Sequence, residues 1–327
     1  MRYVIGVDGG GTKTHCALFD TEGNKIDLIE WGATNHESMQ GGFEELKIEL
    51  GKLLNCILSK NKISMDEIET GIFGMAGADT RLQHKTISAI IESLGMKKHI
   101  LCNDAFLGIK AGCLSGFGIC AINGTGCTVA GIDDRGEMLQ IGGQGAITGD
   151  KGGGGYIAYS AIERVYSSLY KNGPSTIMKE MVFKELGIAS DIDYLETVTY
   201  NLISDREVLK TICKLAFDAA NKGDEPALGL FEEIGINYFN CLCGIIKKLD
   251  FSSADPLEII LTGSVFTKGA NSIIIDTVKK KISESNLGNN IEFKILTVPP
   301  VAGAVIWGLE SVHGNNGLFG KVIDSFA

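Results

Sequence analysis

The chain has 327 residues, a length that permits two domains of ordinary size. A hydrophobic content of 44% and a charged content of 21% are typical of packed globular domains and argue against a disordered chain. The formal net charge of −10 argues against nucleic acid or an anionic membrane as the main partner, because both carry negative charge.

The sequence pattern does not suggest a membrane or secreted protein. Asp8 interrupts the early apolar run, which is too short for the core of a signal peptide. No run reaches the roughly 18 apolar residues that a transmembrane helix needs. The chain has nine cysteines, an odd number, and they are scattered along the sequence, as expected for free thiols in a reducing compartment. We therefore expect a cytoplasmic protein with no membrane partner.

In the first part of the chain, short apolar runs alternate with amphipathic stretches. The runs predict strands at about 3–8, 13–20, 25–32, 69–74 and 98–102, and the stretches predict helices at about 41–59, 80–95 and 105–114. Three strands in succession, followed by strands that alternate with helices, indicate an α/β fold with a mixed sheet.

The same pattern restarts at about residue 117. Strands are expected up to about 141 and at about 257–262 and 291–297, a glycine-rich loop at 142–155, and helices at about 269–284 and 301–313. Several helices between about 155 and 249 resemble an insertion in this second copy. We place the boundary near Ser115–Phe117, which predicts domains at 1–116 and 117–327.

The segment from Asp8 to Thr14 is the most informative one. It reads Asp-Gly-Gly-Gly-Thr-Lys-Thr between two apolar runs and predicts a β-hairpin. Its glycines leave backbone N–H groups free to face an anion, Asp8 can hold a hydrated metal ion, and Thr12 and Thr14 offer hydroxyls. This combination suits a nucleoside triphosphate with Mg²⁺, and the alternative is an ordinary surface turn.

A second glycine turn, Asn123–Thr128, follows the apolar run that opens the second half. Both copies continue into a strand and then an acidic turn, Asp20–Gly23 in one and Asp133–Gly136 in the other. We infer a domain duplication in which two phosphate-binding hairpins face each other. Chance similarity between glycine-rich turns is the alternative.

Asp104 lies where a strand ends and a helix begins. In one interpretation it is a general base that accepts a proton from a substrate hydroxyl at the cleft between the two halves. In the other it is a helix N-cap that accepts N–H bonds from the first turn. One carboxylate can serve both roles with its two oxygens.

Three further segments are candidates for ligand contacts. Asn35 and His36 follow the third strand, and the Asn35 amide suits sugar hydroxyls or an acetamido group. The loop 142–155 is so rich in glycine that backbone access to a ligand is expected, although a flexible linker is the alternative. The turn at 262–266 could hold adenosine or could be a plain strand-to-helix turn.

Seven segments in this order resemble the N-acetylglucosamine kinase branch of the BadF/BadG/BcrA/BcrD ATPase family, which belongs to the sugar kinase, actin and heat-shock ATPase superfamily. They are 8–14, 34–36, 103–108, 123–126, 142–152, 220–224 and 262–266. The resemblance implies two ribonuclease-H-like (actin-like ATPase) domains with mixed five-stranded sheets, hinged around a cleft. It also implies ATP-dependent transfer, with Mg²⁺, of the γ-phosphoryl group to the 6-hydroxyl of an N-acetylated hexosamine, and a homodimer.

The resemblance also implies roles for individual residues, with Asp104 as the catalytic base and Asp8 orienting Mg²⁺ through water. The residues implied on the sugar side are Asn35, His36, Asp104, Cys127, Thr128, Gly143, Gln144 and Asp150. The residues implied on the ATP side are Gly10, Gly11, Thr12, Lys13, Gly124, Thr125, Gly126, Ala220, Gly263, Ser264 and Lys268.

The chain departs from its relatives at three places. Cys127 stands where a serine is common, Gln144 where an aromatic residue is common, and Lys151-Gly152-Gly153 where Glu-Gly-Ser is common. A wider sugar site with an added amide and a lysine predicts tolerance for N-acetylmuramate, whose 3-O-lactyl group is an anion.

Other functions stay open at this stage. One is an ATPase that activates an electron-transfer system through an iron–sulfur cluster, which needs exposed thiolates, whereas Cys16, Cys102 and Cys120 lie in apolar runs. Another is a bacterial glucokinase or repressor with a zinc site, yet Cys241 and Cys243 fit a helix interior better than a zinc motif. The last is a sugar-sensing regulator that has lost catalysis.

Overall fold

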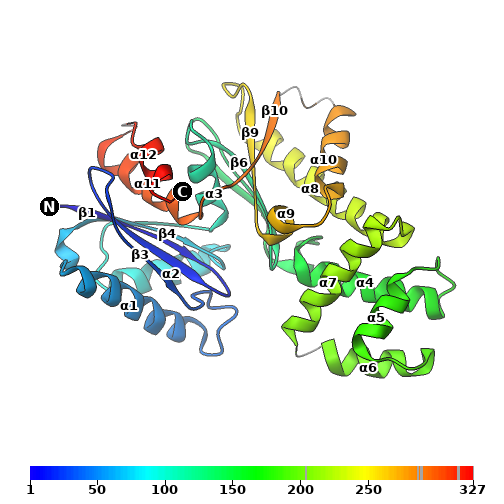
Figure 1. Ribbon diagram of the computed structural model, residues 1–327. Coiled ribbons are helices and arrows are strands. Elements are labelled where there is room, and N and C mark those ends of the chain that lie inside the picture. Colours follow the sequence, from blue (N-terminus) through cyan, green and yellow to red (C-terminus); the bar gives the residue numbers. More distant parts are fainter. Residues whose placement is uncertain (203–204, 286, 288–289, 315–316, 327) are drawn as a thin grey trace.

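The computed structural model describes residues 1–202, 205–285, 287, 290–314 and 317–326. Two five-stranded sheets lie side by side, with helices packed against them (Figure 1). Each sheet mixes parallel and antiparallel neighbours. The predicted α/β fold with two mixed five-stranded sheets is therefore confirmed. We call the parts built on the first and the second sheet the first lobe and the second lobe.

The first sheet has the strand order β3-β2-β1-β4-β5. Its strands are β1 (Tyr3–Gly9), β2 (Thr14–Asp20), β3 (Lys25–Trp31), β4 (Ile68–Met75) and β5 (His99–Cys102). The first three pair antiparallel, whereas β1, β4 and β5 run parallel. β1 and β4 are apolar along most of their length because the sheet is covered on both faces.

Helices α1 (Gly42–Asn61) and α2 (Arg81–Ser93) cover one face of this sheet with buried leucines and isoleucines at helical spacing. The other face packs against α11 (Val301–His313), from the far end of the sequence, and α12 (Phe319–Asp324) packs beside α11. No helix was predicted at the position of α12. Both termini lie on this lobe (Figure 1). The domain boundary near residue 116 stays a prediction, with α11 and α12 packed on the first lobe.

The second sheet has the order β10-β9-β6-β7-β8, which is the order of the first sheet read from the other edge. Its strands are β6 (Gly118–Asn123), β7 (Cys127–Ile132), β8 (Met138–Gly142), β9 (Leu257–Thr262) and β10 (Ile291–Ile295). The directions repeat as well, with β6, β7 and β8 antiparallel and β6, β9 and β10 parallel. This repeat agrees with the duplication inferred from the two glycine turns.

Helix α3 (Ala105–Gly112) lies between the two sheets. It packs on Ile72 of the first sheet and on Cys120 and Ile260 of the second. The contact is close, since a Cβ on Gly108 would lie 2.4 Å from the Cys120 sulfur. The small residue lets the helix approach the second sheet, and the start of α3 thereby comes to lie between the lobes.

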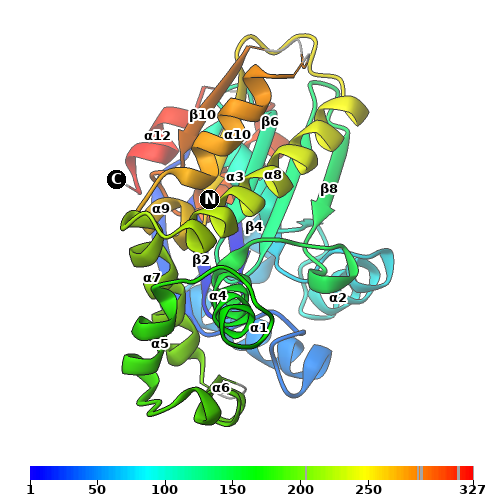
Figure 2. The ribbon, with the colours of Figure 1, turned by 90° about the vertical axis from the view of Figure 1, so that its right-hand side faces the viewer.

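In its described residues, the range predicted as a helical insertion holds five α-helices. They are α4 (Gly153–Tyr170), α5 (Met178–Leu186), α6 (Tyr194–Leu202), α7 (Arg206–Asn221) and α8 (Glu225–Lys248). Figure 2 shows α4 to α7 gathered at one end of the second lobe, whereas α8 runs along its sheet. In the part of the chain that the structure describes, no helix is both long and apolar enough to cross a membrane.

Two helices follow β9, namely α9 (Ser264–Lys268) and α10 (Ile273–Ser283). The sequence predicted a helix from about 269, and α10 begins later than that. The Asn271 side chain accepts a hydrogen bond from the Ile273 backbone N–H, so the helix starts only after this residue.

Candidate active site

A cleft of about 620 Å³ lies between the lobes and brings together most of the predicted site. It is lined from the first lobe by Asp8, Gly10, Gly11, Thr12, Lys13, Asn35 and Asp104, and from the second by Gly124, Thr125, Gly126, Cys127, Thr128, Gly143, Gly263 and Ser264. The predicted residues His36, Gln144, Asp150, Ala220 and Lys268 do not line it.

The first glycine turn closes the β1–β2 hairpin. Gly10 donates its backbone N–H to the Lys13 carbonyl at 3.1 Å, so Gly11 and Thr12 form the tip. A Cβ on Gly10 would lie 2.8 Å from that carbonyl oxygen, which explains the glycine. The prediction for Thr14 is wrong: its side chain is fully buried and its hydroxyl bonds that of Thr34, so it cannot face a phosphate.

The second glycine turn closes the β6–β7 hairpin and is held by the start of α4. The Asn123 carboxamide oxygen accepts the Gly153 N–H at 2.7 Å, and the Gly124 carbonyl accepts the Gly154 N–H at 2.8 Å. A side chain at Gly126 would meet no atom within 4 Å and would project into open space. The α4 N-terminus therefore adds its positive dipole end to this hairpin.

Asp104 precedes α3, and its carboxylate makes no capping hydrogen bond. Its neighbour Asn103 supplies that bond, since the Asn103 side-chain oxygen accepts the Ala105 N–H at 2.9 Å. The capping interpretation of Asp104 is thus wrong, and Asp104 lines the cleft. Burial, together with the charges of Asp8 and Asp79, raises the pKa of Asp104 to about 7.

Asn35 and His36, in the loop after β3, have different surroundings. The Asn35 oxygen accepts the Glu37 N–H at 2.9 Å, and Asn35 lines the cleft beside Gly11. His36 is buried, and its ring stacks on Phe43 at a centroid distance of 4.0 Å. The geometry thus gives Asn35 access to a ligand and His36 a packing contact.

The glycine-rich loop after β8 folds around Asp150. This carboxylate accepts the N–H groups of Gly143 and Gly145, both at 2.8 Å, and the Thr148 hydroxyl at 2.8 Å. Gln144 turns to Asp79, to which its side-chain N–H donates at 2.8 Å. Gly143 alone among these loop residues lines the cleft, and the linker interpretation does not fit so many fixed contacts.

The far end of the cleft is formed by the turn after β9. Gly263 has a φ of +89°, and a Cβ there would lie 2.4 Å from the Asn123 carbonyl oxygen, so a glycine is needed beside the second hairpin. Ala220 is buried and Lys268 is exposed away from the cleft. Arg206 at the start of α7 does line the cleft, and no sequence motif pointed to it.

The donor groups fit a nucleotide with a hard cation. Magnesium binds one or two carboxylates together with waters and phosphate oxygens, and Asp8 supplies a carboxylate beside both glycine turns. Gly126 lines the cleft, and a side chain there would project into the space beside the glycine turns. Cys241 and Cys243 lie on α8, as predicted, and in the described ranges no group of three His, Cys, Asp or Glu side chains could hold a metal.

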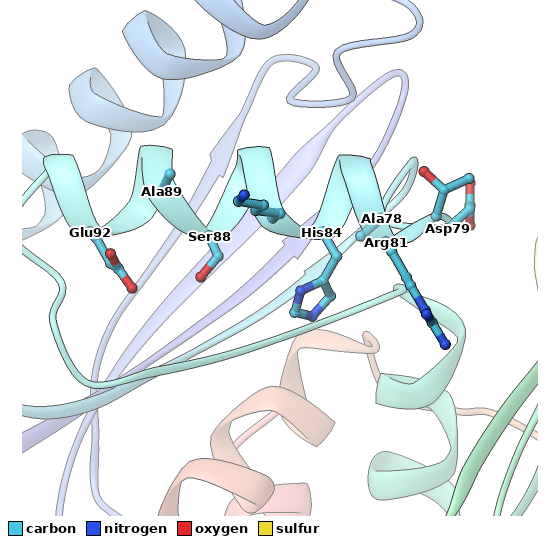
Figure 3. A pocket seen from close by; sticks show the side chains of 9 residues that line it. Ala78, Asp79, Arg81, His84, Ser88, Ala89 and Glu92 are labelled. Atoms are coloured by element: carbon cyan, nitrogen blue, oxygen red, sulfur yellow. The ribbon is translucent and has the colours of Figure 1, made fainter.

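A second hollow, of about 750 Å³, runs along α2 from Asp79 to Glu92 (Figure 3). It is lined by Arg81, His84 and Ser88 among others, and neither glycine turn reaches it. Asp79 lines both hollows, which therefore meet at this residue. The cleft between the lobes remains the candidate active site because it holds both hairpins.

Comparison with known proteins identifies relatives along nearly the whole chain. The model of the BadF/BadG/BcrA/BcrD ATPase family matches residues 5–308. An N-acetylmuramic acid/N-acetylglucosamine kinase of Clostridium acetobutylicum is 30% identical over 263 residues, which cover 80% of this chain and 84% of that protein. An N-acetyl-D-glucosamine kinase of Dictyostelium discoideum is 26% identical, with 94% and 98% covered.

Among solved structures, a candidate N-acetylglucosamine kinase from Chromobacterium violaceum superposes with a TM-score of 0.70 at 18% identity. The superposition covers 94% of this chain and 99% of that one. A likeness at this identity concerns the fold, and the predicted actin-like ATPase fold is confirmed.

Proposed function

Because this chain belongs to the BadF/BadG/BcrA/BcrD ATPase family, we propose that it is an ATP-dependent amino-sugar kinase. It transfers the γ-phosphoryl group to the 6-hydroxyl of N-acetylglucosamine. The observation that carries the proposal is one cleft lined by both glycine hairpins and by Asp104, whose carboxylate is not used in capping. The names of the two relatives support an N-acetylated hexosamine as the acceptor.

The residues divide the work along the cleft. The backbone N–H groups of the two hairpins face the phosphates, where fixed dipoles stabilise charge as it shifts in the transition state. Asp104 accepts the proton of the sugar hydroxyl late, because the transition state is loose and the hydroxyl need not ionise early. Asp8 would hold magnesium through water, and the ion would neutralise charge on the phosphate oxygens.

The sugar lies at the end of the cleft formed by Asn35, Asp104 and Gly143. The Asn35 amide suits a hydroxyl or the acetamido group. Adenosine lies at the other end, against Gly263 and Ser264. Closure of the lobes excludes water that would otherwise hydrolyse ATP. The hinge of this closure is α3, which packs on both sheets.

The direct test measures ADP release by the purified protein with a panel of sugars, followed by NMR of the product. We expect N-acetylglucosamine to be turned over and phosphorus coupling to appear at the C6 protons. ADP release that no sugar stimulates would reject the kinase and favour an ATPase or a sugar sensor.

N-acetylmuramate is proposed as a second substrate. Lys151 and Arg164 both pair with Glu233, so this cluster beside the glycine-rich loop carries one net positive charge that favours a lactyl carboxylate. The same assay with N-acetylmuramate tests this proposal, since an absence of turnover would remove it.

We also propose a homodimer, which light scattering on the protein as it elutes from a size-exclusion column would test.

A further inference from the structure

Asp79 is a carboxylate held by an unusual set of donors. It lies in the turn between β4 and α2, at the end of α2 opposite Glu92 (Figure 3). One oxygen accepts the side-chain N–H groups of Asn103 at 2.8 Å and Gln140 at 2.6 Å, and the other accepts that of Gln144 at 2.8 Å. In the described part of the chain this carboxylate forms no ion pair, and its negative charge is stabilised by hydrogen bonds from three neutral amides.

The three donors come from both sides of the cleft. Asn103 belongs to the first lobe, whereas Gln140 lies on β8 and Gln144 in the loop that follows, both in the second lobe. Gln140 and Gln144 flank Gly143, which lines the sugar end of the cleft. The Asp79 carboxylate thus fastens the glycine-rich loop of one lobe to the other lobe.

Asn103 connects this contact to Asp104. Its side-chain N–H donates to Asp79, and its side-chain oxygen accepts the Ala105 N–H at 2.9 Å. Asp104 lies between these two residues in sequence, and its own carboxylate does not cap the helix. The backbone that carries Asp104 is therefore oriented by an amide that Asp79 fixes.

We propose that Asp79 is a positioning residue, which ties the sugar-side loop of the second lobe to Asn103 and through Asn103 orients Asp104. The proposal rests on the proposed role of Asp104 as the base. It predicts that lobe closure and placement of the base are coupled through one carboxylate. Loss of that carboxylate lets the loop leave the cleft and lets the base turn from the sugar hydroxyl.

Two substitutions at Asp79 distinguish the hydrogen bonds of its carboxylate from the size of its side chain. Asp79→Ala removes the acceptor for all three amides. Asp79→Asn keeps the oxygen that Asn103 and Gln140 share and replaces the other by an amide N–H. Gln144 can then rotate its own amide and accept that N–H, so most of the bridge survives. The matched control is Asp27→Ala, which removes a carboxylate that bonds Lys60 and Asn61 within the first lobe.

The experiment measures kcat, the KM for ATP and the ratio of N-acetylglucosamine phosphate formed to ATP consumed. For Asp79→Ala we expect kcat to fall by about 10- to 100-fold, as for misplacement of a reacting group. The KM for ATP should stay within about twofold, because the hairpins are untouched, and the product ratio should fall as water enters. Asp79→Asn should recover most of both losses, and Asp27→Ala should keep the wild-type kcat and ratio.

Wild-type kcat and product ratio in Asp79→Ala would overturn the proposal, and so would equal losses in Asp79→Ala and Asp27→Ala. If Asp79→Ala does not fold, the double variant Gln140→Ala/Gln144→Ala replaces it, since Asp79 and Asn103 then stay paired. An unchanged product ratio in the double variant contradicts the cross-cleft role. Asp104→Asn in the same assay separates the two hypotheses, because its full activity would reject the proposed base itself.

Discussion

The raised pKa of Asp104 predicts an acid limb in the rate profile near neutral pH. A general base must be ionised to accept a proton, so the rate should rise with pH through its pKa. Burial, together with the charges of Asp8 and Asp79, sets this pKa at about 7. At that value about one carboxylate in ten is ionised at pH 6 and about nine in ten at pH 8. An ordinary aspartate would be fully ionised over this whole range.

The assay is kcat/KM for ATP and N-acetylglucosamine between pH 5 and 9, because this ratio reports the ionisation of the free enzyme. We expect roughly a tenfold loss from the plateau at pH 6. Asp27→Asn, far from the cleft, should keep the wild-type limb. A profile that is flat down to pH 5 would refute the assignment.

Three further outcomes are expected. Asp104→Asn should raise thermal stability at pH 8, because a carboxyl whose folded pKa is raised stabilises the fold at low pH and loses that contribution as pH passes about 7. Removing the charge should therefore increase the free energy of unfolding by on the order of 1–3 kcal/mol. An unchanged Tm at pH 8 would contradict this. Gly126→Val should raise the KM for ATP at least about tenfold with an unaltered circular dichroism spectrum, because its side chain projects into the space beside the glycine turns, and an unchanged KM would place the phosphates elsewhere. Asp8→Asn should shift the magnesium dependence of the rate to higher concentration by about tenfold, and the same half-saturation as wild type would remove Asp8 from the metal site.

Much of the fold could be predicted because its signals are local. Apolar runs with glycine turns predicted both hairpins. The repeated pattern predicted two similar sheets, and their strand orders are the same. The packing of α11 on the first sheet could not be foreseen, because no local pattern in 301–313 says which of two similar sheets it covers. The close approach of α11 to β1, where a Cβ on Gly6 would lie 2.9 Å from the Ala304 Cβ, fits this choice.

The candidate site divides in a similar way. Sites made of backbone N–H groups, such as the turns at Gly10 and Gly126, can be predicted from the sequence, because glycines clustered between two strands mark them directly. The roles of Thr14 and Asp79 depend on long-range partners and did not follow. Thr14 is turned into the core toward Thr34 by the alternation along β2. Asp79 follows a strand, as Asp104 does, and no sequence motif marks it.

The most direct test of the central claim is the turnover of Asp104→Asn with ATP and N-acetylglucosamine. The amide keeps the shape of the side chain and cannot take a proton from the sugar hydroxyl. We predict that kcat falls by about 10²- to 10⁴-fold while the sugar still binds. Turnover close to that of the wild-type protein would contradict the claim that this carboxylate prepares the acceptor.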